Sequence, residues 1–433
     1  MQIVEWIEYQ RSLVEVRIEH IPFAELSKWT FSQSKGIIKH DSGGFFTIEG
    51  IEVKTSFGEK KRWDQPIINQ AEIGYLGFIV RKFQDGYKFL VQAKIEPGNI
   101  NYVQLSPTIQ ATKSNFTQVH GGRKPDYLDY FANPNKKIVV DQLQSEQSER
   151  FIKKRNRNII IEVEDKVEDK ENFIWLTLAE IKDALKLDNV LNMDSRTVIS
   201  NLNYSLLNKF YNNEMNNENN FTKSLTSMNS QLYTFAELKS WLTELKFKYD
   251  LSIRSKKLTD LRDWEITDYE IRSKLHKFKV IGADITISNR EVAHWTQPLM
   301  EAVEEGIFAF IVSNINGVLH FLVQAKLESG CLDKFELAPT IQCYESEITT
   351  PYLDILKSNK HKIIHDSWQS EEGGRFFREQ NRNMIIEIKD YRECQPLSEN
   401  YRWMTLNQLY RFMEFNNYVN IQARSILATI DYR

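Results

Sequence analysis

The chain repeats part of its own sequence after 232 residues. Trp63-Asp-Gln-Pro-Ile returns as Trp295-Thr-Gln-Pro-Leu, and Phe89-Leu-Val-Gln-Ala-Lys94 returns as Phe321-Leu-Val-Gln-Ala-Lys326. Leu105-Ser-Pro-Thr-Ile-Gln110 returns as Leu337-Ala-Pro-Thr-Ile-Gln342 with the same offset. A duplication of this kind constrains the number of structural units before any secondary structure is considered.

The repeat extends over most of the chain. Asn156-Arg-Asn158 matches Asn381-Arg-Asn383, and Phe23-Ala-Glu-Leu matches Phe235-Ala-Glu-Leu. Because 433 residues suit two cores of about 200 residues each, we predict one domain at residues 1–200 and another at 232–433. The segment 201–231 has nine asparagines in its first twenty residues, which predicts a poorly ordered linker.

Each copy has the same predicted order of elements. A short helix is expected from Phe23 or Phe235 onward, then several apolar and β-branched runs, then a closing helix. Both closing helices start with a capping box, Thr177-x-x-Glu180 and Thr405-x-x-Gln408, which satisfies free amide donors of the first turn. Several strands followed by a helix, twice over, predict two α+β domains.

The run from Val103 to Thr112 alternates polar and apolar residues. Gln104, Ser106 and Thr108 fall on one face of the predicted strand. Pro107 cannot donate to a strand ladder, so this strand is expected at an edge or with a bulge. Its polar face is either the solvated side of an edge strand or a surface that forms hydrogen bonds to a ligand.

Composition and missing motifs exclude several classes of function. A net charge of −3 gives no basic field for nucleic acid, and no apolar run approaches the roughly 20 residues of a membrane span. The N-terminus lacks a signal-peptide pattern, and the three cysteines form no Cys-x-x-Cys, which suits a cytoplasmic protein without structural zinc. Neither Gly-x-x-x-x-Gly-Lys-Ser/Thr nor Gly-x-Gly-x-x-Gly occurs.

Polar and aromatic residues near the repeats could bind a ligand. Lys113 follows the alternating strand and offers a point charge for phosphate. The alternative is that this segment is an ordinary polar loop without a ligand. Trp29 stands 11 residues before His40, and Trp264 stands 12 before His276. These tryptophans are either core residues or flat surfaces for stacking a base or a sugar.

Several longer motifs resemble those of the NDP-hexose 2,3-dehydratases. They are Val91-Gln-Ala-Lys-x-Glu-Pro-Gly-Asn99, Val103-Gln-Leu-Ser-Pro-Thr-x-Gln-Ala-Thr112, Ser114-Asn-x-Thr-x-Val-His-Gly-Gly122, Asp141-Gln-Leu-Gln-Ser-Glu-Gln147 and Glu371-Glu-Gly-Gly-Arg-Phe376. The resemblance runs in order from about Phe23 to Leu427. It implies two tandem Nudix-like domains, a homodimer, and a nucleotide-sugar site in each half. The Nudix catalytic box is absent, so metal-dependent pyrophosphate hydrolysis is not implied.

The same resemblance implies dehydration of an NDP-4-keto-6-deoxyhexose without a redox cofactor, with a 3-ketoreductase acting on the unstable product. No metal-binding residues are predicted, and the sequence leaves open whether a metal assists. Such a reaction needs a base for the C3 proton and an acid for the leaving C2 hydroxyl. The candidates are the titratable residues inside the shared motifs, namely Glu96, His120, Glu146, Glu328 and Glu371. A non-enzymatic nucleotide-sugar sensor and a drifted Nudix-like hydrolase remain alternatives.

Candidate nucleotide-sugar contacts lie in segments shared by the two copies, beside the polar strand. In the first copy they are Trp29, Thr112, Lys113, Ser114, Asn115, Phe116 and Ser145. In the second copy they are Trp264, Lys326, Gln342, Cys343, Tyr344, Asn381, Arg382, Asn383 and Met384. Lys326 and Arg382 are the candidates for the pyrophosphate. The residues leave open which half carries out the chemistry.

Overall fold

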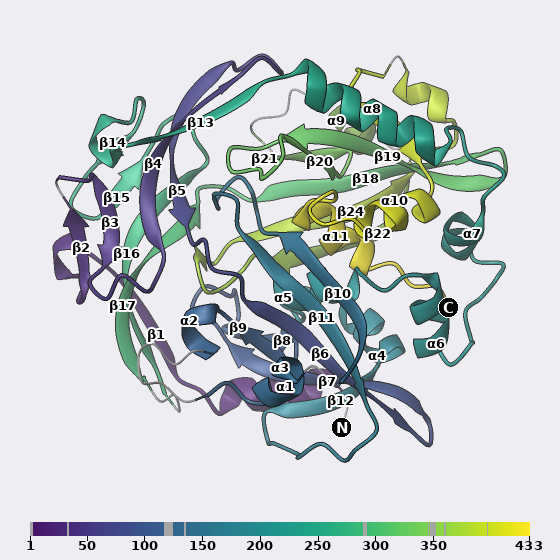
Figure 1. The fold of residues 1–433 in the computed structure, drawn as a ribbon, viewed down its shortest axis with the longest axis horizontal. Helices are drawn as coiled ribbons and strands as arrows, with labels where there is room; N and C mark the ends of the chain where they lie inside the picture. The colour runs from purple at the N-terminus through teal and green to yellow at the C-terminus, as the bar shows by residue number, and fades with distance from the viewer. Residues whose placement is uncertain are drawn as a thin grey trace.

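The computed structural model of the protein describes residues 3–32, 34–116, 124–133, 136–288, 292–344, 346, 352–358, 361–395 and 397–433. These residues form four β-sheets with short helices around and between them, a mixed α+β architecture (Figure 1). Within the described ranges, no helix is long and apolar enough to cross a membrane. Residues 1–200 are called the first half below, and residues 232–433 the second half.

Each half contains one seven-stranded mixed sheet. The strands are β6 (Tyr75–Phe83), β7 (Gly86–Ile95), β8 (Val103–Ser106), β9 (Ile109–Ala111), β10 (Lys137–Ser145), β11 (Arg155–Val163) and β12 (Phe173–Thr177) in the first half, and β18 (Gly306–Ile315), β19 (Val318–Leu327), β20 (Phe335–Ala338), β21 (Ile341–Tyr344), β22 (Lys362–Ser370), β24 (Gln380–Glu387) and β25 (Tyr401–Met404) in the second. The orders β10-β11-β6-β7-β12 and β22-β24-β18-β19-β25 correspond strand by strand. The duplication seen in the sequence is therefore also a duplication of topology.

The two smaller sheets are built by strand exchange between the halves. One contains β2 (Trp29–Ser32), β3 (Ile37–His40), β4 (Thr47–Thr55), β5 (Arg62–Asn69) and β13 (Leu251–Lys256), and the other contains β1 (Val16–Ile21), β14 (Glu265–Ile266), β15 (Glu270–Arg272), β16 (Phe278–Ile287), β17 (His294–Ala302) and β23 (Phe376–Phe377). Thus β13 of the second half pairs with β4, and β1 of the first half pairs with β16. In Figure 1 the purple β1 lies beside green strands, and the teal β13 runs along the purple β4.

Two equivalent helices, α5 (Met193–Ile199) and α11 (Ile421–Ala428), pack against each other between the large sheets. Each carries a buried arginine that reaches into the other half. Arg196 donates to the carbonyl oxygen of Ser370, and Arg424 donates to the carbonyl oxygen of Ser145. The main hydrophobic core contains residues of both halves, so the halves share their interior.

The predicted match of Phe23 with Phe235 is wrong. Residues Phe23–Glu25 form a short 3-10 helix (η1) after β1, and the segment that follows β13 in the same way is the 3-10 helix η2 (Leu258–Asp260). Phe235 instead begins α8 (Phe235–Lys248), which precedes β13 as α1 (Ile3–Ser12) precedes β1. The four identical residues therefore stand at positions that are not equivalent relative to the exchanged strand.

The prediction of a poorly ordered linker is also wrong. Residues 201–231 contain α6 (Tyr204–Phe210) and α7 (Asn220–Thr226). Asn203 and Asn219 cap these helices, which is a role for which asparagine is well suited. Leu207, Phe210 and Leu225 enter the main core. The asparagines thus begin helices rather than prevent order, whereas the domain boundaries themselves stay a prediction.

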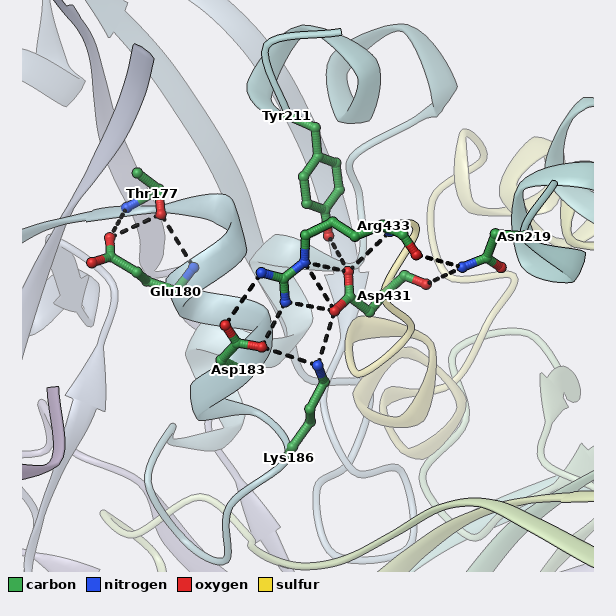
Figure 2. Close-up of polar contacts among 8 residues, drawn as sticks. All are labelled: Thr177, Glu180, Asp183, Lys186, Tyr211, Asn219, Asp431 and Arg433. Atoms are coloured by element: carbon green, nitrogen blue, oxygen red, sulfur yellow. Dashed lines mark hydrogen bonds and ion pairs between the residues drawn. The ribbon is translucent and has the colours of Figure 1, made fainter. Parts of the chain in front are cut away.

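The end of the chain lies against this segment and against the first half (Figure 2). Asn219 Nδ2 donates to the carbonyl oxygens of Asp431 and Arg433 at 3.2 and 3.0 Å. Arg433 pairs with Asp183, and Lys186 Nζ lies 2.9 Å from Asp431 Oδ2. These contacts tie the second half to α4 (Leu178–Ala184) of the first.

Both predicted capping boxes are confirmed. Thr177 Oγ1 accepts from the backbone N–H of Glu180 at 3.2 Å, and the Glu180 carboxylate accepts from Thr177 N at 2.7 Å (Figure 2). Thr405 and Gln408 cap α10 (Leu406–Met413) in the same way. The remaining short helices are α2 (Lys113–Phe116), α3 (Leu128–Ala132), α9 (Leu353–Lys357) and η4 (Tyr391–Cys394).

The polar run at residues 103–112 forms two short strands on either side of Pro107, each paired with one other strand, so the predicted edge position is confirmed. Its first part, β8, pairs with β7, and its second part, β9, pairs with β6. The alternative of a solvated face is wrong, because Gln104, Ser106 and Thr108 are all buried. Thr108 Oγ1 accepts from Ile79 N at 2.9 Å, so part of this polar face satisfies the sheet itself.

Candidate active site

A cavity of about 1050 Å³ lies between the large sheet of the first half and both small sheets. This volume is at the upper end of the roughly 300–1,000 Å³ typical of small-molecule sites. The residues that line it and carry charge or an aromatic ring include Trp29, His40, Phe45, Phe46, Lys94, Glu96, Lys124, Asp126, Glu146, Phe151, Lys154, Asp194, His294, Trp295, Glu372 and Arg375. Because the last four come from the second half, both halves build the site.

Three carboxyl groups of the cavity each keep one buried oxygen without a hydrogen-bond partner. These atoms are Glu146 Oε2, Asp194 Oδ1 and Glu372 Oε2. The second oxygen of Glu146 accepts from Asn156 Nδ2 at 2.7 Å, and Glu372 Oε1 accepts from Gly374 N at 3.0 Å. Unpaired buried oxygens are costly, so they indicate a group that exchanges a proton or meets a ligand.

Burial and mutual repulsion favour the protonated form of these acids. Burial raises the pKa of Glu146, and burial with the neighbouring Glu146, Glu96 and Glu372 carboxylates raises the pKa of Asp194 well above its usual range. Burial, followed by the Glu96 carboxylate, raises the pKa of Glu372 to about 7. Groups that hold protons near neutral pH are suited to acid and base catalysis.

Glu96 differs from the other three acids because both of its oxygens are held. Gln110 Nε2 donates to Glu96 Oε1 at 2.7 Å, and Asn192 Nδ2 donates to Glu96 Oε2 at 3.3 Å. Asn99 Nδ2 lies 3.4 Å from the same oxygen. This carboxyl is fixed in position at the end of β7.

Three of the cationic side chains that line the same cavity are not exposed, namely Lys94, Lys154 and Arg375. Lys94 Nζ donates to the carbonyl oxygen of Gln110 at 2.9 Å, and Lys154 Nζ donates to that of Glu72. The Arg375 guanidinium lies 4.2 Å from the ring centre of Phe46. Burial lowers the pKa of Lys154 and of Arg375. A phosphate would lower the cost of burying their charge.

Aromatic rings form one wall of the cavity. The Trp29 ring lies 5.3 Å from His40 and 4.9 Å from Phe46, measured between ring centres. Trp29 Nε1 donates to the carbonyl oxygen of Thr296 at 2.9 Å, which fixes the indole against the second half. A base or a sugar ring could pack on this wall.

A model of the NDP-hexose 2,3-dehydratase family matches residues 1–202 and 235–430. The chain belongs to this family. Similar proteins named dTDP-4-dehydro-6-deoxy-alpha-D-glucopyranose 2,3-dehydratase are 42% identical in Saccharopolyspora spinosa, over 95% of this chain and 87% of the relative. Those of Amycolatopsis orientalis and Streptomyces violaceoruber are 38% and 35% identical, over 98% of this chain and 89% and 95% of theirs. The two matched segments agree with the duplication read from the sequence.

Four of the first-half residues that the sequence singled out line the cavity of this family member, namely Trp29, Glu96, Thr112 and Glu146. Lys113 and Phe116 lie in α2, where Phe116 packs against Tyr75 and neither lines the cavity. The side chains of Ser114 and Asn115, and all of His120, lie outside the described residues. Ser145 is buried and donates to Glu336 Oε2 at 2.7 Å.

The predicted catalytic residues of the second half lie away from the cavity. Glu328 accepts from Gln342 at 2.7 Å, and Glu371 accepts from Asn381 at 2.6 Å. Burial raises the pKa of Glu328 to about 7 and that of Glu371 to about 8. Neither carboxyl lines the cavity of the first half.

The predicted binding residues of the second half also contact the protein itself. Lys326 Nζ donates to the carbonyl oxygen of Gln342 at 2.8 Å, and Trp264 Nε1 donates to that of Asp64 at 2.7 Å. Among the other predicted binding residues, the Tyr344 hydroxyl accepts from Arg150 and Arg382 pairs with Asp366. Asn383 donates to the carbonyl oxygen of Asn381, and Met384 and Cys343 pack in an apolar cluster.

The two halves differ at an equivalent position that lines the cavity of the first half. Tyr344 stands where the first half has Thr112, and its hydroxyl contacts the buried Arg150. Arg150 lies over Phe278 at 3.8 Å, as Arg375 lies over Phe46. The small Thr112 side chain leaves room that the larger Tyr344 takes up in the second half.

The charged cavity residues missed at the sequence level include Lys94, Lys154, Asp194, Glu372 and Arg375. Candidates were chosen because both copies share them, which conceals a residue that only one copy carries. A comparison of the differences between the copies would have singled out Lys154, Asp194 and Glu372. Arg375 needed the tertiary structure, since both copies have an arginine there.

Proposed function

We propose that this chain removes water across C2 and C3 of dTDP-4-keto-6-deoxyglucose in the cavity of the first half, giving a 3,4-diketo-2,6-dideoxy sugar. Family membership supports the reaction, and the names of the three relatives support the substrate. The single observation that carries the proposal to this cavity is the set of three unpaired buried carboxyl oxygens beside buried cations.

The reaction needs only proton transfers. The C4 ketone acidifies the C3 proton, a base removes that proton, and the electron pair becomes the C3–C4 enolate. The C2–O bond then breaks as an acid protonates the leaving hydroxyl, and the C4 ketone re-forms. The resulting C3 enol takes a proton at C2 and becomes the second ketone. The acidic side chains of the cavity whose pKa values are raised by burial suit such steps.

Substrate binding divides between the cations and the aromatic wall. Lys94, Lys154 and Arg375 are the proposed partners of the pyrophosphate, and Trp29 packs against the base or the sugar. Thr112 lines the same space. In this proposal, the equivalent region of the second half has the same fold but does not carry out the reaction. It contains Glu328, Glu371 and the binding candidates of the second half.

Other features implied by the family resemblance remain proposals. We propose that the mixed seven-stranded sheets belong to two Nudix-like units, a view supported by their matching strand order and their central parallel pairs β6–β11 and β18–β24. A cytoplasmic homodimer, and a 3-ketoreductase that uses the product, are proposed on the same basis.

The test is incubation of the purified protein with dTDP-4-keto-6-deoxyglucose, with mass spectrometry to detect the loss of one water. A 3-ketoreductase and its reduced nicotinamide cofactor should be present, because the diketo product is unstable. A sensor would bind the substrate without turnover, and a hydrolase would release a nucleoside monophosphate in the presence of magnesium. Either result would contradict the proposal. The UDP sugar tested in parallel would show which base is preferred.

A further inference from the structure

The duplication provides an internal comparison for four of the five acids in the cavity; the fifth, Asp126, is paired with Lys170. The two acids Glu96 and Glu146 have acidic counterparts, Glu328 and Glu371, in the second half. The other two acids do not. Glutamine occupies the counterpart positions, Gln422 for Asp194 and Gln147 for Glu372.

The structure confirms that these positions are equivalent. Asp194 and Gln422 each lie two residues after the asparagine that caps α5 or α11. Gln147 and Glu372 each lie two residues after the end of β10 or β22. All four side chains are at least partly buried. An amide has nearly the shape of a carboxyl group but cannot exchange its proton near neutral pH.

The cavity therefore has two carboxyl groups where the equivalent positions of the second half have amides. The acids shared by both halves accept hydrogen bonds from amide side chains, Gln110 and Asn156 in the first half and Gln342 and Asn381 in the second. Because both halves share these bonds, their role is to hold the loops and strands in place. Asp194 and Glu372, in contrast, line the cavity of the first half and have amide counterparts in the second half.

This step rests on the dehydration proposed above. We infer that Glu372 and Asp194 are the catalytic carboxyls, with Glu372 removing the C3 proton and Asp194 protonating the C2 hydroxyl as it leaves. The C3–H bond and the C2–O bond break, a bond forms between C2 and C3, and one water departs. Tautomerisation then moves the enol proton to C2, and no oxidant or reductant is required.

The surroundings of the two carboxyls decide between the roles. Glu372 Oε1 accepts the Gly374 N–H at 3.0 Å, and the Arg375 guanidinium offsets part of the rise in its pKa that burial and the Glu96 carboxylate cause. The charged form is the one that can accept a proton. Glu372 is therefore the base.

Asp194, like Glu372, keeps one buried oxygen without a partner, but burial and three other carboxyl groups of the cavity raise its pKa well above the usual range. Lys94 is the cation that counters them. Asp194 thus holds its proton and can donate it. The active site combines Asp194 of α5 with Glu372 of the loop before β23.

The test uses Glu372→Gln and Asp194→Asn, each of which installs the amide type of the counterpart position. The control is Glu336→Gln, because Glu336 is also a buried acid whose counterpart in the first half, Gln104, is an amide, and it lies outside the cavity. Dehydration is followed by mass spectrometry. Deuterium uptake at C3 of recovered substrate in heavy water is measured by NMR, and thermal unfolding reports the fold.

We expect both cavity variants to dehydrate at least about 100-fold more slowly than the wild type, with the control within about threefold. Asp194→Asn should still introduce deuterium at C3, because its base is intact, whereas Glu372→Gln should match the rate without enzyme. Dehydration within tenfold of the wild type in either cavity variant, or the reverse pattern of exchange, would overturn the assignment. A wild-type protein that releases no water would instead contradict the proposed function.

Discussion

Gly98 donates its backbone N–H to the carbonyl oxygen of Gly373 at 2.7 Å, and this bond joins the two halves one residue from Glu372. Arg378 N returns a bond to the carbonyl oxygen of Gly98, also at 2.7 Å. At the equivalent place, Gly330 N donates to the carbonyl oxygen of Ser148 at 2.6 Å. Each half thus holds a loop that the other half extends toward it, and the loop held by Gly98 carries cavity residues.

Gly98→Ala is expected to destabilise the protein and abolish its activity. A Cβ at Gly98 would come within 1.6 Å of the Phe376 carbonyl oxygen, so the loop with Glu372 would have to move. We expect a loss of about 3 kcal/mol in the free energy of unfolding, measured by urea denaturation. Gly58→Ala is the control. It has a φ of +71° but no neighbour within 4 Å, so it should cost only about 1 kcal/mol. Equal losses would show that the close approach is unimportant.

A break in the chain between Met228 and Asn229 should leave the halves associated. This site lies between α7 and α8, and Met228 is 73% exposed. Each fragment supplies the strand that completes a sheet of the other, so either fragment alone would expose an unpaired strand edge. The measurement is co-purification of two co-expressed fragments when one carries a tag. A first fragment that starts at Pro22, without β1, should associate less, and unchanged association would contradict the role of strand exchange.

Lys154→Gln should weaken the binding of dTDP by about tenfold, which corresponds to about 1.4 kcal/mol. Lys154 is buried beside the cavity, where a phosphate would meet little competing water. Isothermal titration calorimetry with dTDP measures the change. The neighbouring Lys153 is exposed and serves as the matched control, since Lys153→Gln should leave the affinity unchanged. Equal affinities for the two variants would remove Lys154 from the proposed phosphate site.

Lys182→Met should stabilise the protein at neutral pH, and the gain should shrink as the pH rises. Burial lowers the pKa of Lys182 from 10.5 to about 7, although its ammonium group donates to the carbonyl oxygen of Ala428. Between these values the unfolded chain binds more protons than the folded one, so the wild type gains stability with increasing pH. Below about pH 7 the full cost of burying the charge is present.

The expected gain for Lys182→Met is on the order of 2 kcal/mol near pH 6 and close to zero near pH 10. Denaturant unfolding at several pH values measures it. Lys186→Met is the control, because Lys186 is paired with Asp183 and Asp431 at the surface (Figure 2) and should lose up to about 1 kcal/mol. A gain for Lys182→Met that does not depend on pH would contradict the buried charge.

Sequence reasoning was most successful where the signal is local. The capping boxes at Thr177 and Thr405 were predicted correctly because the residues of a cap lie within one turn of each other. The edge position of the strands beside Pro107 was predicted correctly because proline has no backbone N–H to donate to a neighbouring strand. The asparagines of residues 201–231 led to the wrong prediction of a poorly ordered linker. An asparagine-rich composition disfavours regular structure, but a single asparagine is also a good cap at the start of a helix.

By itself the sequence determined that the protein is duplicated, that each copy is α+β, and that the chain resembles one enzyme family, because repeats, caps and long motifs are properties of neighbouring residues. Only the tertiary structure decided that β1 and β13 change places and that Glu372 of the second half lines the same cavity as Asp194 of the first. Backbone pairing between strands more than 190 residues apart leaves no local pattern. A duplicated chain can close each sheet with either copy of a strand, so packing of the whole chain makes that choice.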